Sequence, residues 1–156
     1  MITVFFCKSG HVALIPLLER KTVNVEWYIN ACLPKVIGTW SSRCPNMGAR
    51  GLMLHLDKAT THTAATTVDY LQENHIQLVT HPHYSPDHFP CDFFLFPQVK
   101  LQLKGRQFST VKEARITFEI AISDLPYSAW ACAMENWFQR MILCIRAEGR
   151  YIKKLH

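Results

Sequence analysis

The chain has 156 residues, of which 49% are hydrophobic and 19% are charged, and these proportions exclude an intrinsically disordered protein. This length is typical of one domain, large enough to bury about 70% of the surface that the unfolded chain exposes. The net charge of +5 suits a polyanionic partner, but it is equally compatible with an ordinary soluble basic protein.

The six cysteines form no recognisable framework. None stands in a Cys-x-x-Cys pair and four lie inside apolar segments, so we expect reduced thiols rather than disulfides or a zinc site. The apolar segment 1–7 is too short for a signal peptide, and no run approaches ~18 apolar residues. The sequence therefore predicts an intracellular protein that is neither secreted nor bound in a membrane.

The chain opens with a predicted hairpin. Residues 1–7 are apolar on both faces and rich in β-forming residues, which predicts a buried strand. Residues 8–10 turn the chain, and residues 11–17 return as the hairpin partner.

A helix is predicted next, beginning after Asn24, which is a favoured N-cap residue. Apolar side chains recur with helical spacing over residues 25–37, and Gly38 is expected to end the helix. Pro34 interrupts it, at a cost of about 3 kcal/mol unless the helix kinks there. Residues 40–50 are rich in turn formers and predict a loop.

Residues 52–57 read Leu-Met-Leu-His-Leu-Asp, a short apolar run that ends in a carboxylate. This run follows Gly51 and predicts a buried strand that delivers Asp57 to the edge of a sheet. In the two-residue alternation of a strand, one face carries Leu52, Leu54 and Leu56, and the other carries Met53, His55 and Asp57.

A helix and a second short strand follow. Thr60 or Thr61 is placed to cap the helix, and residues 76–80 predict the strand. One face of this helix would carry Ala64, Ala65, Val68 and Leu71. The order strand, hairpin, helix, strand, helix, strand, helix is an α/β pattern.

A proline-punctuated loop over residues 81–90 then opens into an aromatic segment with Asp92 near its start. This segment predicts a helix that Gly105 ends. One helical stripe of the segment carries Asp92, Leu95, Phe96, Val99 and Leu103.

Two more helices are predicted in the C-terminal part. Thr110 and Glu113 have the spacing of a capping box, which opens the first of them, and Pro126 starts the second. The residues expected to face inward are Val111, Ala114, Phe118, Ala121 and Ile122 in the first helix, and Trp130, Met134, Trp137 and Met141 in the second.

Two blocks of sequence surround the aspartates. Residues 54–63 read Leu-His-Leu-Asp-Lys-Ala-Thr-Thr-His-Thr, and residues 84–96 read Tyr-Ser-Pro-Asp-His-Phe-Pro-Cys-Asp-Phe-Phe-Leu-Phe. They resemble the His-Asp-Asn-Ala-x-x-His and Tyr-Ser-Pro-Asp-Leu-Ala-Pro-Ser-Asp-Tyr-x-Leu-Phe blocks of mariner-type transposases. Thirty-four residues, 58 to 91, separate Asp57 from Asp92, as between the second and third catalytic aspartates of that family. The likeness extends to a close that reads Trp137-x-x-Arg140-x-x-x-Cys144-Ile145 and Gly149-x-Tyr151.

The resemblance implies an α/β, ribonuclease-H-like fold in which a mixed sheet is flanked by helices and followed by a helical C-terminal part. It also implies that Asp57 and Asp92 are catalytic metal ligands for Mg²⁺ or Mn²⁺. Cleavage and joining of phosphodiesters use two divalent cations roughly 3.5–4 Å apart, and such hard cations prefer carboxylate oxygens. Outside the resemblance, a turn residue at a strand end and an acid at a helix N-terminus are ordinary roles for the two aspartates.

The family carries its first catalytic aspartate in a Gly-Asp-Glu block on the first, central strand of the sheet, and this sequence has no such block. We therefore expect residues 1–156 to be a partial catalytic domain, truncated before the family's second strand, without a helix-turn-helix domain and inactive alone. Lys58 stands where the family has Asn. A cation beside Asp57 would oppose a divalent ion by ~1–4 kcal/mol at ~4 Å. Cys91 replaces a Ser, which is a milder change.

The alternative is a domesticated or degenerate remnant that acts only as a nucleic-acid-binding or subunit-interaction module. Basic residues cluster near the helix after Asp92, where they could meet phosphates or simply form a solvated face: Lys100, Lys104, Arg106 and Lys112. The implied partners are transposon-end DNA and a second transposase subunit, in the nucleus or elsewhere inside the cell. The eight histidines lack any zinc-binding spacing, and the role of His62, which matches the family block, stays open.

Overall fold

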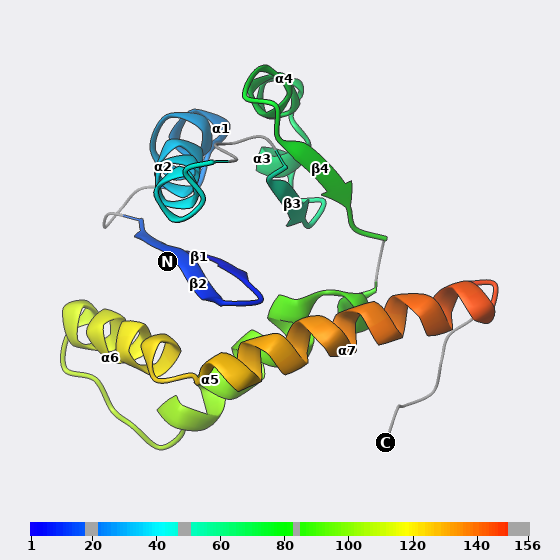
Figure 1. The fold of residues 1–156 in the computed structure, drawn as a ribbon. Coiled ribbons are helices and arrows are strands. Elements are labelled where there is room, and N and C mark those ends of the chain that lie inside the picture. Colours follow the sequence, from blue (N-terminus) through cyan, green and yellow to red (C-terminus); the bar gives the residue numbers. More distant parts are fainter. Residues whose placement is uncertain (18–21, 47–50, 83–84, 150–156) are drawn as a thin grey trace. The chain divides into compact units, whose positions relative to one another are not determined.

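The computed structural model describes residues 1–17, 22–46, 51–82 and 85–149 (Figure 1). The chain divides into two compact units, the first made of Met1–Phe6 and His11–His83 and the second of Cys7–Gly10 and Tyr84–His156. Strands lie mainly in the first unit, and the second is mainly helical. All six cysteines are free thiols.

The N-terminal hairpin is confirmed, with β1 over Ile2–Cys7 and β2 over Gly10–Pro16. The backbone N–H of Leu17 donates to the carbonyl of Met1 over 2.9 Å and closes the open end of the hairpin. The expectation that β1 is buried on both faces was wrong, because only Phe5 of this strand is buried. In the described ranges β1 pairs with β2 alone, and a two-stranded ribbon leaves much of its surface uncovered.

The predicted helix after Asn24 is confirmed at its start and extends beyond its expected end. It consists of α1 (Val25–Trp27), a π-helical turn η1 (Tyr28–Cys32) and α2 (Leu33–Arg43). The side-chain oxygen of Asn24 accepts the N–H of Trp27 over 2.8 Å, which is the expected cap.

Two features of this helix differ from the expectation. Pro34 is the second residue of α2 and directly follows the π-helical turn, so the interruption expected at Pro34 is a local change of helix type and not an end of the helix. Gly38 does not end the helix, and residues 40–43 are helical rather than loop. A single helical glycine costs only about 1 kcal/mol. That cost is small beside the burial of Leu33 and Val36 on the inner face of α2.

The two short strands flanking the middle helices are β3 (Met53–Leu56) and β4 (Gln77–Thr80), and they pair in parallel from Met53↔Gln77 to Leu56↔Thr80. The predicted alternation holds, since Leu52, Leu54 and Leu56 are buried while Met53 and Asp57 are exposed. The sheet content of the described ranges is thus a hairpin and a parallel pair, which together give the mixed strand directions that were expected.

The crossover between β3 and β4 contains α3 (Thr60–Thr63) and α4 (Ala65–Glu73), and α4 contacts both η1 and β4. Neither Thr60 nor Thr61 caps a helix with its side chain, contrary to the prediction. Ala64 leaves helical geometry at ψ 138 and divides the crossover in two. On the face predicted for this helix Leu71 is buried as expected, whereas Ala65 is exposed and Thr67 is buried instead.

The second unit contains η2 (Pro86–His88), a π-helical turn η3 (Cys91–Leu95), α5 (Phe96–Leu103), α6 (Val111–Ser123) and α7 (Tyr127–Arg146), the last drawn in orange in Figure 1. The Thr110 half of the capping box is confirmed, since Thr110 Oγ1 accepts the N–H of Glu113 over 3.1 Å. The Glu113 carboxylate reaches one residue further back than predicted and accepts the N–H of Ser109 over 2.9 Å. Gly105 lies beyond α5 with φ +78, as expected of a helix-ending glycine.

The inner faces of these helices were predicted only in part. Leu95, Val99, Ala121, Ile122 and Trp130 are buried as expected, together with Ala133. Val111 is 68% exposed, because it is the first residue of α6, and Phe96 is exposed as well. Met134, Trp137 and Met141 are half-buried.

Candidate catalytic site

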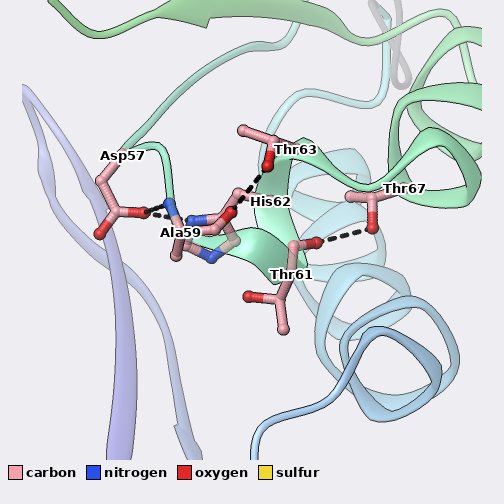
Figure 2. Close-up of polar contacts among 6 residues, drawn as sticks. All are labelled: Asp57, Ala59, Thr61, His62, Thr63 and Thr67. Carbon is pink, nitrogen blue, oxygen red and sulfur yellow. Dashed lines mark hydrogen bonds and ion pairs between the residues drawn. The ribbon is translucent and has the colours of Figure 1, made fainter. Parts of the chain in front are cut away.

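Asp57 immediately follows β3, and its side chain is 50% exposed. Its Oδ1 atom accepts two hydrogen bonds, one from the N–H of Ala59 over 3.0 Å and one from Nδ1 of His62 over 2.6 Å (Figure 2). The first bond forms an Asx turn, which the short Asp side chain favours at the end of a strand. Because an ionised carboxylate only accepts hydrogen bonds, Nδ1 of His62 is the donor.

His62 is held from two sides. The imidazole lies against the ring of Tyr28 in η1, with centroids 4.7 Å apart. The backbone of α3 is tied to its surroundings by Thr63 Oγ1, which donates to the carbonyl of Ala59, and by Thr67 Oγ1, which donates to the carbonyl of Thr61 over 2.7 Å (Figure 2). Sequence comparison pointed to His62, but only the structure shows its contact with Asp57.

Tyr28 is 1% exposed, and its hydroxyl has no hydrogen-bond partner in the part of the chain that the structure describes. Burial raises the pKa of this hydroxyl well above its ordinary value, and the charges of Cys32 and Asp57 add to the rise. Tyr28 therefore acts toward His62 as a neutral, packed ring. From the sequence it was only one of the apolar residues with helical spacing over 25–37.

Lys58 was expected to oppose a cation at Asp57 if the two side chains lay together. Lys58 is exposed, and among the ion pairs of the described ranges none joins it to Asp57. An exposed Lys side chain is ordinarily solvated. Lys58 therefore opposes a divalent cation at Asp57 by less than a lysine in direct contact with the carboxylate would.

Two histidines meet on the same parallel pair of strands. Nδ1 of His81, just beyond β4, lies 3.3 Å from Nε2 of His55 in β3, and the rings meet edge to face. Burial, with a smaller contribution from the neighbouring His81, lowers the pKa of His55 to about 4. His55 is therefore neutral at physiological pH.

Asp92 lies at the start of η3 in the second unit and is exposed. The segment around it is anchored by Arg140 of α7, whose guanidinium lies 4.3 Å from the centroid of the Phe93 ring. Arg140 also donates to the backbone carbonyl of Asp87 over 3.0 Å, while the Asp87 carboxylate is 4.0 Å away. Asp87 thus meets Arg140 mainly through its backbone carbonyl.

The four basic residues singled out from the sequence are all exposed in the second unit. Lys100 lies in α5 and Lys112 in α6, two helices that contact one another, while Lys104 and Arg106 lie in the connection between them. The exposure of these four side chains is compatible both with phosphate contacts and with a solvated face.

The oxygen donors of Asp57 and Asp92 are of the kind that Mg²⁺ and Mn²⁺ prefer. In the described ranges, however, no three His, Cys, Asp or Glu side chains gather closely enough to hold a metal ion. The donor chemistry thus fits a hard cation, while the donor number is smaller than a complete site needs. None of the helices in these ranges is long and apolar enough to cross a membrane.

No protein-family model matches the chain. Among characterised proteins, the Mariner Mos1 transposase of Drosophila mauritiana is 24% identical over 168 residues, which cover 98% of this chain and 45% of that protein. The human histone-lysine N-methyltransferase SETMAR is 22% identical over 151 residues, which cover 97% of this chain and 22% of that protein. The chain therefore spans less than half the length of either relative.

Solved structures of Mos1 transposase are similar to this chain as well. The catalytic domain of Mos1 mariner transposase is similar with a TM-score of 0.85 at 21% identity, over 97% of this chain and 75% of that chain. The Mos1 paired-end complex with the left transposon end is similar with a TM-score of 0.86 at 21% identity, over 97% and 44% of the two chains. These likenesses confirm the resemblance drawn from the two aspartate blocks, and the chain has the ribonuclease-H-like fold of a mariner-type transposase catalytic domain.

Proposed function

We propose that this chain is part of a mariner-type DNA transposase and that Asp57 and Asp92 are two of its metal-ligand positions. The observation that carries the proposal is the exposure of both carboxylates, each on an anchored segment, with thirty-four residues between them on the fold of the Mos1 catalytic domain. Asp57 is anchored through the Asx turn and His62, and the Asp92 segment through Arg140.

Mg²⁺ or Mn²⁺ is the cofactor that this assignment implies. Mos1 structures have been determined with Mg and with Mn, and its complexes contain transposon ends. When bound, such ions activate the attacking oxygen and stabilise the leaving oxygen of a phosphodiester. The part of Asp57 and Asp92 in that chemistry is to supply negative oxygen ligands from two separate segments of the fold.

We propose further that residues 1–156 do not cut or join DNA by themselves. The Gly-Asp-Glu block that carries the family's first catalytic aspartate has no counterpart in the sequence. Two carboxylates facing two dications leave about two positive charges without protein compensation and leave the ions without a third fixed ligand. A longer product or a partner that supplies this carboxylate would complete the site.

The partners that fit this function are transposon-end DNA and a second transposase subunit, and the place of action is the nucleus or elsewhere inside the cell. The net charge of +5 and the exposed basic residues around the connection from α5 to α6 support a polyanionic partner. If the chain binds DNA but takes part in no catalysis, it fits the alternative of a domesticated or degenerate transposase that acts only as a binding module.

The test is nicking of a supercoiled plasmid in Mg²⁺ or Mn²⁺ by the purified chain, alone and mixed with a longer relative's segment that carries the Gly-Asp-Glu block. We expect no nicking alone and metal-dependent nicking in the mixture, lost in Asp57→Asn and in Asp92→Ala. Asp69→Ala is the matched control, because Asp69 is an exposed acid in α4 that belongs to neither anchored segment.

Two results would contradict parts of the proposal separately. Nicking by the chain alone that disappears in Asp92→Ala would overturn its inactivity and support the role of the acid. Nicking that survives both Asp57→Asn and Asp92→Ala would remove these residues from the chemistry.

A further inference from the structure

The carboxylate of Asp57 is engaged on one side only. Both of its hydrogen bonds, from Ala59 and from His62, end on Oδ1. In the described ranges no donor reaches Oδ2, and half of the side chain is open to solvent. Figure 2 shows both bonds ending on the same oxygen. The other oxygen can therefore accept a ligand.

The bond from His62 does more than the Asx turn to fix the carboxylate plane. The turn alone ties Oδ1 to a backbone N–H two residues away, which the side chain can satisfy in more than one orientation. A second donor at 2.6 Å, five residues further along the chain, restricts that rotation. An exposed carboxylate without such a partner would lose this freedom only when a cation binds, at a cost in affinity.

His62 is itself unable to turn away. Only 19% of its side chain is exposed, and its ring lies against Tyr28, which is fully buried in η1. The backbone N–H of His62 donates to the carbonyl of Ala59 over 2.9 Å, so the same short segment fixes both donors to Oδ1. Tyr28 makes this contact with its ring, since its hydroxyl bonds to no described residue.

We infer that His62 is a positioning residue for Asp57: it pins Oδ1 through Nδ1 so that Oδ2 is presented to a divalent cation, with the Tyr28 ring fixing the imidazole plane. The inference rests on the proposed metal-ligand role of Asp57. The simpler reading, in which the contact only stabilises the turn after β3, predicts lower stability in variants but unchanged affinity for the cation.

Substitutions of His62 that place a donor at different positions distinguish the positioning role from a purely stabilising one. The side-chain nitrogen of Asn can occupy the place of Nδ1, that of Gln reaches to the place of Nε2, and Ala has no donor. In an Mn²⁺ titration of the folded full chain, followed by the electron paramagnetic resonance of free Mn²⁺, His62→Asn should bind within about twofold of the unaltered chain. His62→Gln and His62→Ala should bind roughly tenfold more weakly, the effect of losing an outer partner of a metal ligand.

Tyr28 supplies an independent pair of variants. Tyr28→Phe keeps the ring and removes a hydroxyl that has no described partner, so Mn²⁺ affinity should not change. Tyr28→Leu removes the ring and should weaken binding as His62→Gln does. Equal Mn²⁺ affinity in the Asn, Gln and Ala variants of His62, all folded by circular dichroism, would overturn the inference while leaving Asp57 as a ligand.

A metal-free readout distinguishes failure of the proposed function from failure of the inference. If Asp57→Asn leaves Mn²⁺ binding unchanged, the proposed ligand role of Asp57 is wrong. The ¹⁵N shifts of the His62 imidazole then decide the positioning contact: a single Nδ1–H tautomer that is lost in Asp57→Ala supports it. A tautomer mixture that Asp57→Ala does not alter overturns it.

Discussion

Arg140 in α7 donates a hydrogen bond of 3.0 Å to the backbone carbonyl of Asp87, a residue 53 positions earlier in the chain. The same guanidinium lies over the ring of Phe93, directly beside Asp92. One side chain thus fixes both the turn η2 and the π-helical turn η3 to the long C-terminal helix. The position of Asp92 within the second unit depends on this contact.

Removing this anchor should loosen the segment around Asp92. Arg140→Ala loses a charge-assisted hydrogen bond and a cation–π contact, together worth about 1–3 kcal/mol of unfolding free energy. Arg140→Lys keeps the charge but not the planar group that stacks on Phe93. Its unfolding free energy should therefore lie between those of Arg140→Ala and the unaltered chain. Urea denaturation gives the free energy, and amide exchange over residues 87–93 locates the loosening.

The control for Arg140 is Asp87→Asn. The carboxylate of Asp87 is 4.0 Å from Arg140 and 54% exposed, whereas the bonded acceptor is the backbone carbonyl, which this variant keeps. We expect a change below about 0.5 kcal/mol, as for an exposed ion pair. A loss as large as that of Arg140→Ala would show that the carboxylate, not the carbonyl, carries the contact.

Stability should fall as the pH falls through the range set by His55. The unfolded side chain titrates near 6.5 and the folded one near 4, so between these values the unfolded chain binds more protons. The folded state therefore loses stability as pH drops from about 6.5 to about 4, and the loss is complete below the folded pKa. Because His55 is only partly buried, we expect it to account for a loss of about 1–2 kcal/mol of unfolding free energy over this pH range.

Thermal or urea unfolding at a series of pH values checks this prediction. His55→Gln should flatten the dependence without abolishing it, because burial and the charge of Arg43 also lower the pKa of His11. His75→Asn is the control: His75 is exposed with φ 57, a conformation that Asn tolerates. An equal pH dependence in His55→Gln and the unaltered chain would contradict the role given to His55.

Two helix starts were predictable because their chemistry is local. Asn24 and Thr110 bond to N–H groups three residues away, so the sequence alone contains both partners. The alternation of Leu52, Leu54 and Leu56 was predictable for the same reason, because a strand repeats every two residues.

The contacts that position the candidate ligands were not predictable in this way. Arg140 reaches Asp87 across 53 residues, and Tyr28 meets His62 from another helix. Motif matches placed both Arg140 and His62 among residues of interest, but no spacing rule gives their partners. At Gly38 a local rule failed for the same reason. Burial of residues of α2 against the rest of the first unit outweighs the tendency of a glycine to end a helix.

The capping box of α6 gives a direct test of one local prediction. Thr110→Ala leaves the N–H of Glu113 without its side-chain acceptor and should lower the unfolding free energy by about 1 kcal/mol. Thr117→Ala is the control: its hydroxyl donates to the carbonyl of Glu113 within the helix, and alanine is the better helix former there. If the two variants lose the same stability in thermal unfolding, the cap does not stabilise α6.

DNA binding by the exposed basic residues of the second unit can be separated from general charge by its salt dependence. Each Lys or Arg that contacts a phosphate contributes about 0.9 to the slope of log K against log salt concentration. Changing Lys100, Lys104, Arg106 and Lys112 together to Gln should weaken binding to a short duplex and reduce that slope by about 2–4. Fluorescence anisotropy across a salt series measures both quantities.

The matched control for this charge change is Lys35→Gln. Lys35 is exposed on α2 in the first unit and belongs to no basic cluster that the sequence suggested. Its loss removes one positive charge, so it should leave the slope unchanged if binding is local to the connection from α5 to α6. A slope that falls equally per charge removed at Lys35 and at the cluster would instead indicate that DNA responds to the overall charge of +5.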